Sequence, residues 1–385
     1  MRRFDELVEA GFEAIELWAA FGPNATDSVT FEYTNPNAVE AVAGALSSSG
    51  IRVHSMHGPM FLGPPNGHSP FGYAGLEGLL EAERAGLDAV MSLGGRFLVT
   101  QDAAERLPED VPHLASEDAL RQLAEYAVAH GCAFCVENGA ESAEAIDRLV
   151  ALVHRIGHPG LGICLDVGHA QVWCFNDVPR LIRAAGQWLR TVHLHDNIGV
   201  ADAHQAAGDG ILPWHAILEA LREVGYRGPL LSEAWSGGGR GSVVEVLTRA
   251  RALLGSLADR SWDPVARAGG ADVFPADEAD RRRARSLLSA SIGDADDAVI
   301  AVDRFGDPVA WAEAAGDDEA VLVMSARVGA GEAGEVARAT LSALRGPSVR
   351  GVRAEGHAAA ALVATGFASD DAGIMRPGND TGSAR

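Results

Sequence analysis

The sequence predicts an α/β protein: a TIM-type β/α barrel followed by a smaller α+β domain. From residue 11 to about 255 one unit recurs, made of a short β-rich run, a polar turn and an amphipathic helix. Strict alternation of strands and helices over ~250 residues is typical of a closed parallel barrel. Beyond about residue 270, a helix is followed by several strands in a row, which is typical of α+β domains.

Seven β-rich runs are the expected barrel strands, and helices are expected between them. The apolar residues from Ile146 to Ile156, for example, recur at helical spacing until Gly157 stops the run. The strands are expected at Phe12–Trp18, Ile51–His57, Arg96–Gln101, Cys132–Glu137, Leu161–Asp166, Thr191–Asp196 and Pro229–Ala234.

The barrel is expected to lack its first strand in this chain. A complete barrel of this type has eight strands, but the chain opens in a helix-like segment, Phe4–Ala10, where a strand would precede it. An open barrel exposes two parallel edges, which is unfavourable for a soluble protein. We therefore expect a misplaced start site or a truncated chain.

The expected boundaries are a barrel over residues 1–255, a linker over 256–270, an α+β domain over 271–378 and a disordered tail over 379–385. The linker is where the periodic pattern lapses, and the tail is rich in Gly, Asp and Ser. In the second domain we expect helix Asp277–Ser289, strands Ala298–Asp303, Pro308–Ala314 and Ala320–Ala326, helix Gly334–Leu344, strand Val349–Ala354 and helix His357–Thr365.

Composition and charge limit the classes of partner. The formal net charge is −22, which argues against general affinity for nucleic acid or an anionic membrane, since such binding draws on a basic surface. No apolar run approaches the ~20 residues that span a bilayer, and acidic residues interrupt the N-terminal stretch too often for a signal peptide. We expect a cytoplasmic enzyme or binding protein that acts on a small molecule.

Acidic and imidazole side chains gather at the ends of the expected strands, where a β/α barrel carries its working residues. In a low-dielectric cavity such groups would repel or desolvate one another unless a cation holds them. Carboxylates with one or two imidazoles suit Mn²⁺, Mg²⁺, Co²⁺ or Zn²⁺. Singly, each residue also fits a loop cap or a core histidine; the joint pattern predicts a metal site. The residues are His54, His57, Glu137, Asp166, His169, His193, His195, Asp202, His204 and Glu233.

The same stretches carry a family resemblance. GFEAIELW, HSMHGP, ENG, LDVGH, VHLHDN and SEAW, in this order over about residues 1–255, resemble the xylose-isomerase-like barrel superfamily. That superfamily includes sugar and sugar-phosphate isomerases and epimerases, inosose and 3-dehydroshikimate dehydratases, and the family 2 apurinic endonucleases. Its members often dimerise, so the resemblance also allows a homodimer.

The resemblance implies roles for individual residues. The metal quartet of the isomerases falls on Glu137, Asp166, His193 and Glu233, and the substrate-binding histidine on His169, which with the two glutamates forms the implied catalytic set. Second-metal or substrate-binding positions fall on His57, His54, His195, Asp202 and His204. The endonuclease branch has a further histidine where this chain has Thr100 or Gln101, so a three-metal DNA-repair site is not expected.

Three functions remain open at this stage. In an isomerase or epimerase the metal would polarise a carbonyl group, Glu137 or Glu233 would remove the neighbouring proton, and the other glutamate would return it. A dehydratase or lyase on a cyclic keto-polyol, such as an inosose or 3-dehydroshikimate, would share the first step and then expel a hydroxyl group. A non-catalytic metabolite-binding protein would bind its ligand and form no product.

The second domain resembles, weakly, a GNAT-type acetyltransferase over residues 271–378. The resemblance implies an acetyl-CoA loop at Arg327–Glu335, but Glu332 and Glu335 would oppose its phosphates. Leu362 stands where the family has a tyrosine acid. We therefore expect a degenerate domain kept for interaction and not for acetyl transfer.

Overall fold

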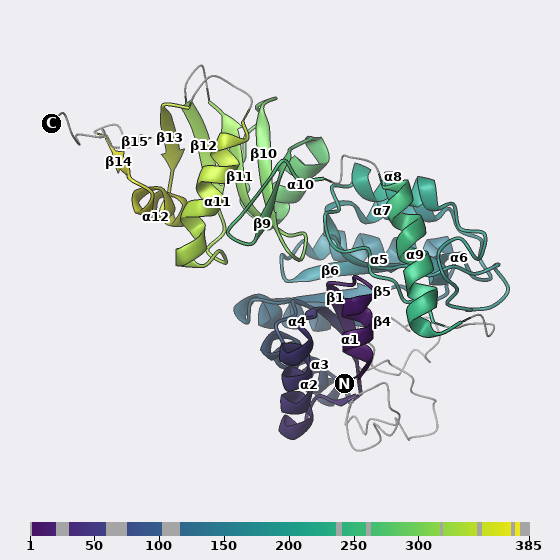
Figure 1. Cartoon of the computed structure of the whole chain (residues 1–385). Helices are drawn as coiled ribbons and strands as arrows, with labels where there is room; N and C mark the ends of the chain where they lie inside the picture. Colours follow the sequence, from purple (N-terminus) through teal and green to yellow (C-terminus); the bar gives the residue numbers. More distant parts are fainter. Residues whose placement is uncertain are drawn as a thin grey trace. The chain divides into compact units, whose positions relative to one another are not determined.

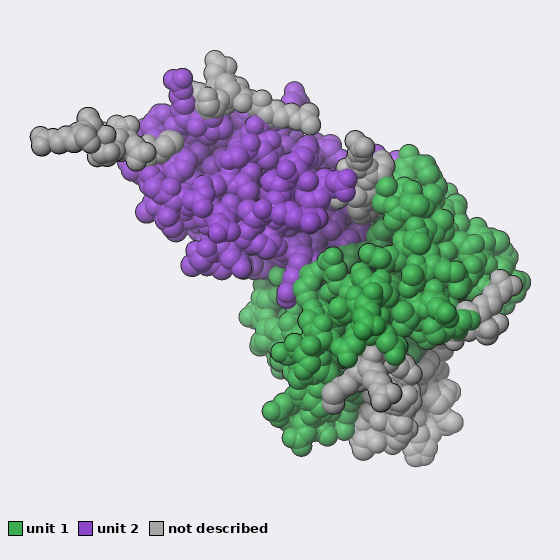
Figure 2. Space-filling model, viewed as in Figure 1, with its two compact units in different colours: residues 1–221, 229–258 green, residues 222–228, 259–385 purple. Residues whose placement is uncertain are grey.

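The computed structural model describes residues 2–20, 31–58, 75–101, 116–235, 241–258, 263–315, 319–344, 349–370 and 374–377 (Figure 1). The chain forms two compact units (Figure 2). Unit 1 comprises residues 1–221 and 229–258, and unit 2 comprises residues 222–228 and 259–385. The expected tail at 379–385 lies outside the described residues.

Unit 1 is built on a seven-stranded sheet in the order β2-β1-β3-β4-β5-β6-β7. Every described pairing in it is parallel, which confirms the α/β class and agrees with a TIM-type barrel. The strands are β1 (Ala14–Ala20), β2 (Phe31–Glu32), β3 (Arg52–His57), β4 (Phe97–Gln101), β5 (Ala133–Glu137), β6 (Leu161–Asp166) and β7 (Leu189–His193).

Helices connect these strands, and their ends follow from local sequence. In α5, the Ser142 side chain accepts a hydrogen bond from the N–H of Ala145, and Gly157 closes the helix in the left-handed conformation. The helices are α1 (Arg2–Glu9), α2 (Pro36–Ser49), α3 (Gly75–Ser92), α4 (Glu117–Ala129), α5 (Ala143–Ile156), α6 (Val167–Gln171), α7 (Val178–Ala185), the short 3₁₀ helix η2 (Gly186–Trp188), α8 (Trp214–Glu223) and α9 (Val243–Leu257).

The last predicted barrel strand is not a regular strand. Residues 229–234 make one isolated parallel bridge, between Leu194 and Ser232, supported by hydrogen bonds from Leu194 N to Leu231 O and from Glu233 N to Leu194 O. The strand predicted at Thr191–Asp196 ends at His193, because Asp196 pairs with Gln205 of the following loop. The two-residue strand β2 was not predicted.

Unit 2 contains an eight-stranded mixed sheet in the order β14-β15-β13-β12-β11-β10-β9-β8. Its one described parallel pair is β12 with β13, and helix α11 (Ala330–Ser342) connects the two. The other helices are α10 (Glu278–Leu287) and α12 (Gly356–Ala364). The strands are β8 (Ala266–Ala268), β9 (Ala271–Pro275), β10 (Ala298–Asp303), β11 (Pro308–Ala314), β12 (Glu319–Met324), β13 (Gly351–Ala354), β14 (Phe367–Ser369) and β15 (Met375–Pro377).

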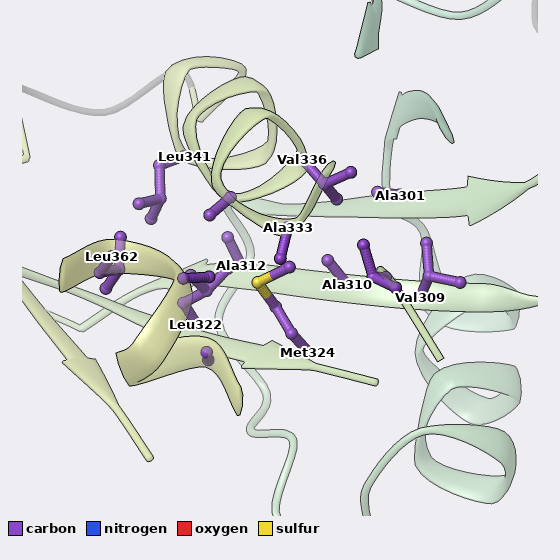
Figure 3. Close-up of a cluster of buried hydrophobic side chains, with 14 of the residues drawn as sticks. Ala301, Val309, Ala310, Ala312, Leu322, Met324, Ala333, Val336, Leu341 and Leu362 are labelled. Atoms are coloured by element: carbon purple, nitrogen blue, oxygen red, sulfur yellow. The ribbon is translucent and has the colours of Figure 1, made fainter. Parts of the chain in front are cut away.

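Strands β10 and β11 are buried on both faces of this sheet, and alternate residues of each strand point to opposite faces. Val299 and Ala301 belong to the core under α11 and α12, whereas Ile300 belongs to the core beside α10. Figure 3 shows the first core, in which Val336 and Leu341 of α11 lie over the strands.

Two boundaries predicted for this region are wrong. The expected linker 256–270 contains the end of α9, at Leu257, and strand β8, which pairs with β9. Helix α11 begins at Ala330, four residues before the expected Gly334, so most of the glycine-rich stretch is helix. Gly334 allows close packing there, since a Cβ would lie 2.6 Å from Thr365 Cγ2. The GNAT-type resemblance stays a prediction.

Across the described parts of the chain, no helix combines the length and the apolar character needed to cross a bilayer.

Unit 1 buries an unusual acid. Glu83 of α3 is fully buried, and its Oε2 accepts a hydrogen bond of 2.9 Å from the Thr100 hydroxyl of β4. Its Oε1 atom accepts no hydrogen bond from the residues that the structure describes. Burial outweighs the hydrogen bond and raises the pKa of Glu83 to about 8.

This burial makes stability depend on pH. The pKa of Glu83 is raised to about 8 in the folded chain, whereas its ordinary value is 4.5. Between about pH 5 and pH 8, Glu83 is therefore protonated in the folded chain and ionised in the unfolded chain. Relative to Glu83→Gln, the wild type should lose about 1.4 kcal/mol of unfolding free energy per pH unit across that window. Denaturant unfolding at several pH values measures this. Glu81→Gln, on the exposed face of the same helix, should keep the wild-type slope; an equal slope in Glu83→Gln would contradict the assignment.

Candidate metal centre

Four side chains converge at the carboxyl ends of the parallel strands. Glu137 ends β5, Asp166 ends β6, His193 ends β7, and Glu233 lies in the extended segment that bridges to Leu194. One ligand atom of each lies within 4.8 Å of the others. Parallel strands end at the same edge of a sheet, which is why residues far apart in sequence meet there.

The imidazole of His193 stands among three carboxylates. Its Nδ1 lies 3.1 Å from Glu137 Oε1, 3.4 Å from Glu233 Oε1 and 3.9 Å from Asp166 Oδ2. His193 and Asp166 are fully buried, and the side chain of Glu233 is 17% exposed. Of these three side chains, only that of Glu233 is in contact with solvent.

The two glutamates differ in their electrostatics. Burial opposes ionisation of Glu137, but the imidazoles of His193, His169 and His57 outweigh it and hold its pKa well below the ordinary value. Burial raises the pKa of Glu233; His193 counteracts this only in part, and repulsion from Glu137 adds to it. One carboxylate of the group is thus left without enough positive charge.

This donor set fits a divalent cation. Three carboxylates and one imidazole supply oxygen and nitrogen ligands of the kind that Mg²⁺, Mn²⁺, Co²⁺ and Zn²⁺ accept. Buried carboxylates repel one another unless a positive charge is placed among them. The pKa of Glu233 is raised first by burial, and the repulsion from Glu137 and Asp166 adds to it. The residues of the predicted quartet are therefore suited to hold one ion.

A second cluster adjoins the first and contains His169, His195, Asp202 and His204, again with ligand atoms within 4.8 Å of one another. Asp202 Oδ2 lies 3.3 Å from the Nε2 atoms of both His169 and His204. His195 Nε2 lies 3.0 Å from Asp166 Oδ1, so Asp166 stands between the two clusters.

The rings of the second cluster are stacked. His195 and His204 lie 15° from parallel with centroids 3.9 Å apart, and His204 stacks on Trp235 in the same way at 3.6 Å. The lone pair of an imidazole nitrogen lies in the ring plane, so two stacked rings aim theirs side by side. A single ion held by both would require one ring to turn. Gly168 makes this packing possible, since a Cβ there would lie 2.0 Å from His195 Cε1.

Asp196 organises the loop that carries Asp202 and His204. Its buried carboxylate accepts hydrogen bonds from the backbone N–H groups of Asn197, Gly208 and Leu212 and from the indole Nε1 of Trp214, at 2.7–3.1 Å. These bonds close the loop at both ends. His204 adopts a positive φ of 43° within it, a strained conformation that the surrounding structure must hold.

The remaining predicted residues lie at different distances from the clusters. His57 Nε2 lies 3.0 Å from Glu137 Oε2, and although burial opposes it, this carboxylate raises the pKa of His57 to about 9. His54 stands apart from both clusters, with Nε2 3.2 Å from Thr191 Oγ1. Thr100 contacts Glu83 instead of the metal centre.

Three residues near the centre were not predicted. Glu16 and Trp18 of β1 point to the same side as alternate residues of a strand, and Glu16 Oε1 lies 3.0 Å from His193 Nε2. The Trp18 ring lies 6.0 Å from His57 and 6.2 Å from Trp235, which is 42% exposed. The spacing of Glu16 and Trp18 in GFEAIELW was a signal that could have identified both.

Sequence comparisons find relatives that match part of the chain. L-ribulose-5-phosphate 3-epimerase UlaE of Salmonella paratyphi A is 27% identical over 92 residues, which is 24% of this chain and 32% of that protein. An uncharacterized protein of Methanocaldococcus jannaschii is 34% identical over 89 residues, 23% of this chain and 30% of that protein. The matches thus span about a third of the length of these relatives.

Solved structures resemble the fold at low identity. A xylose isomerase-like TIM barrel/4-hydroxyphenylpyruvate dioxygenase fusion protein superposes with a TM-score of 0.50 at 20% identity, covering 68% of this chain and 41% of that one. The family model described as xylose isomerase-like TIM barrel matches residues 4–257, which is more than half of the chain and most of unit 1. The chain belongs to the xylose isomerase-like TIM barrel family.

Proposed function

We propose that the chain is a metal-dependent isomerase or epimerase that moves a proton beside the carbonyl group of a small carbohydrate. The observation that carries this proposal is the position of Glu137 and Glu233. These two carboxylates come from different segments of the barrel and lie 3.1 and 3.4 Å from the same imidazole nitrogen, His193 Nδ1. Two bases around one small volume can serve the two faces of a substrate carbon. Relatives named as sugar epimerases support the proposal.

The chain's own groups divide the work. A divalent ion held by Glu137, Asp166, His193 and Glu233 would polarise the carbonyl and stabilise the negative charge that forms beside it. One glutamate removes the proton from the carbon next to the carbonyl, and the other returns a proton to it. His169 belongs to the second cluster, is 12% exposed and lies 3.4 Å from Glu137; it donates a hydrogen bond to a substrate hydroxyl group.

The chain contains no lysine. A lysine amine is the usual protein group that forms an imine with a carbonyl substrate. This chain therefore has no lysine with which to acidify the neighbouring C–H bond through an imine. Activation of the carbonyl by a cation is the remaining route that the described residues support.

For the second cluster we propose contact with substrate hydroxyl groups and not a second ion, because the stacked rings of His195 and His204 do not aim at one point. The expected substrate is a small carbohydrate and not a nucleic acid, in line with the net charge of −22. A cytoplasmic location and a homodimer also stay proposals.

A dehydratase or lyase acting on a cyclic keto-polyol is the second candidate. The observation in its favour is His169, whose Nε2 lies 3.3 Å from Asp202 Oδ2 and whose pKa is raised well above the ordinary value, since the carboxylates outweigh burial. A protonated imidazole could donate its proton to a leaving hydroxyl group. The product would then be one water lighter than the substrate, whereas an isomerase gives a product of equal mass. A non-catalytic binding protein would give no product.

For unit 2 we propose a GNAT-type fold that serves interaction and not acetyl transfer. The parallel pair β12 and β13 joined by α11 supports the fold. Glu332 in the first turn of α11 opposes the binding of phosphates. Leu362 has an apolar side chain that is fully buried in the core, so this position supplies no proton donor.

Removal of either glutamate tests the catalytic assignment. Glu137→Gln and Glu233→Gln should each lower kcat by about 10²–10⁴, in a screen of ketoses, inososes and 3-dehydroshikimate with Mn²⁺, Mg²⁺, Co²⁺ or Zn²⁺ supplied. In each variant, NMR in D₂O should still show exchange of the substrate C–H proton for the epimer whose proton faces the remaining glutamate. Glu144→Gln, an exposed acid on α5, is the control. Full turnover in both glutamate variants, with metal content equal to wild type, would show the acid–base assignment to be wrong.

The number of bound ions tests the proposal that the first cluster binds a metal ion and the second does not. Elemental analysis of metal-loaded, dialysed protein should find one divalent ion per chain. His204→Gln should leave that number unchanged and raise KM, whereas Asp166→Asn should lower the metal content. Two ions per chain, with one lost in His204→Gln, would instead assign a metal to the second cluster.

A further inference from the structure

We infer that Glu16 and Ser55 form a positioning pair that fixes the ring of His193 so that its Nδ1 faces the metal centre. This inference rests on the proposed metal centre, which it deepens. The pair lies on β1 and β3, outside the four residues of the quartet.

Three successive contacts link Ser55 to the metal centre through Glu16 and His193. The Ser55 hydroxyl donates a hydrogen bond of 2.6 Å to Glu16 Oε2. The other oxygen of that carboxylate, Oε1, lies 3.0 Å from His193 Nε2. On the opposite edge of the ring, His193 Nδ1 lies 3.1 Å from Glu137 Oε1. The imidazole therefore separates one outer carboxylate from the carboxylates of the centre.

Burial makes the arrangement rigid. Ser55 and His193 are fully buried, and the Glu16 side chain is 8% exposed. The ring of His57 lies alongside His193, 5.9 Å away between centroids and 28° from parallel. Water thus has little access to the Nε2 edge, and Glu16 Oε1 contacts it at 3.0 Å as an ion pair without the alignment of a hydrogen bond.

A shift in strand register creates the pair. Between β1 and β3, Ile15 pairs with Val53, but the next residue, Glu16, pairs with Ser55. The shift skips His54, which instead contacts Thr191. Without it, Glu16 would face His54, and no hydroxyl group would stand opposite the carboxylate.

The chemical consequence concerns the histidine tautomer. A neutral imidazole carries one N–H and one lone pair, and the hydrogen bond made by one nitrogen decides which nitrogen is free to bind a metal. With an ion in the centre, the carboxylate beside Nε2 would hold the ring proton there and leave the Nδ1 lone pair to the ion, on the side of Glu137, Asp166 and Glu233. Outer partners of this kind typically change metal affinity by about 10–100-fold.

Two readouts on the full chain test the inference. Mn²⁺ affinity, measured by competition with a chelating dye, should fall about 10–100-fold in Glu16→Gln and about 5-fold in Ser55→Ala, which removes one hydrogen bond to the carboxylate. NMR of the metal-free protein, with the ring signals of His193 assigned by His193→Asn, should show a strongly deshielded Nε2–H proton in the wild type that moves upfield in Glu16→Gln, because the charged oxygen beside it is lost. Glu13→Gln, an acid with an 84% exposed side chain just before β1, is the matched control and should change neither value.

The outcomes separate this inference from the proposed function. A wild type that binds no Mn²⁺ contradicts the metal centre, and the NMR result then decides the role of Glu16 independently. Equal Mn²⁺ affinity and an equal Nε2–H signal of His193 in wild type and Glu16→Gln overturn the inference while leaving the metal centre in place. Should Glu16→Gln fail to fold, as judged by thermal unfolding, Ser55→Ala decides: an unchanged affinity overturns the inference.

Discussion

The site in unit 1 depends on one electrostatic constraint: three carboxylates, two of them fully buried, share the space around the His193 imidazole. Glu137, Asp166 and Glu233 come from separate segments, and burial first, with repulsion from the other two carboxylates added to it, raises the pKa of Glu233. Carboxylates that cannot reach water need nearby positive charge. The parallel strands bring these groups together, and the same grouping makes the end of the barrel chemically useful.

The rest of the site is arranged around that constraint. The Asp196 carboxylate accepts hydrogen bonds from three backbone N–H groups of one loop and from the Trp214 indole at the start of α8. These bonds hold the loop so that Asp202 lies beside His169 and His204. Hydrogen bonds to a buried carboxylate are strong because the group has no competing water. The rings of His195, His204 and Trp235 stack on one another beside this loop, and Trp235 is the exposed member of the stack. Rigid side chains of this kind suit a site that must hold a small substrate in one orientation.

Strand periodicity and the position of polar residues at strand ends predicted most strands of unit 1 and the four residues of the quartet. Glu137 and Asp166 end strands that the pattern of apolar residues predicts, and the structure places them together with His193 and Glu233. The sequence could not predict the register shift that sets Glu16 opposite Ser55, because a shift depends on pairing and not on local pattern. The start of α11 at Ala330 was missed because glycines normally argue against helix, whereas Gly334 is required by close packing against Thr365.

The most direct test of the account is the position of a bound ion. A crystal of the chain grown with Mn²⁺ should give one anomalous-scattering peak in unit 1, about 2.0–2.2 Å from ligand atoms of Glu137, Asp166, His193 and Glu233. A peak bound by His169, Asp202 and His204 alone, or no peak in unit 1 at saturating Mn²⁺, would contradict it.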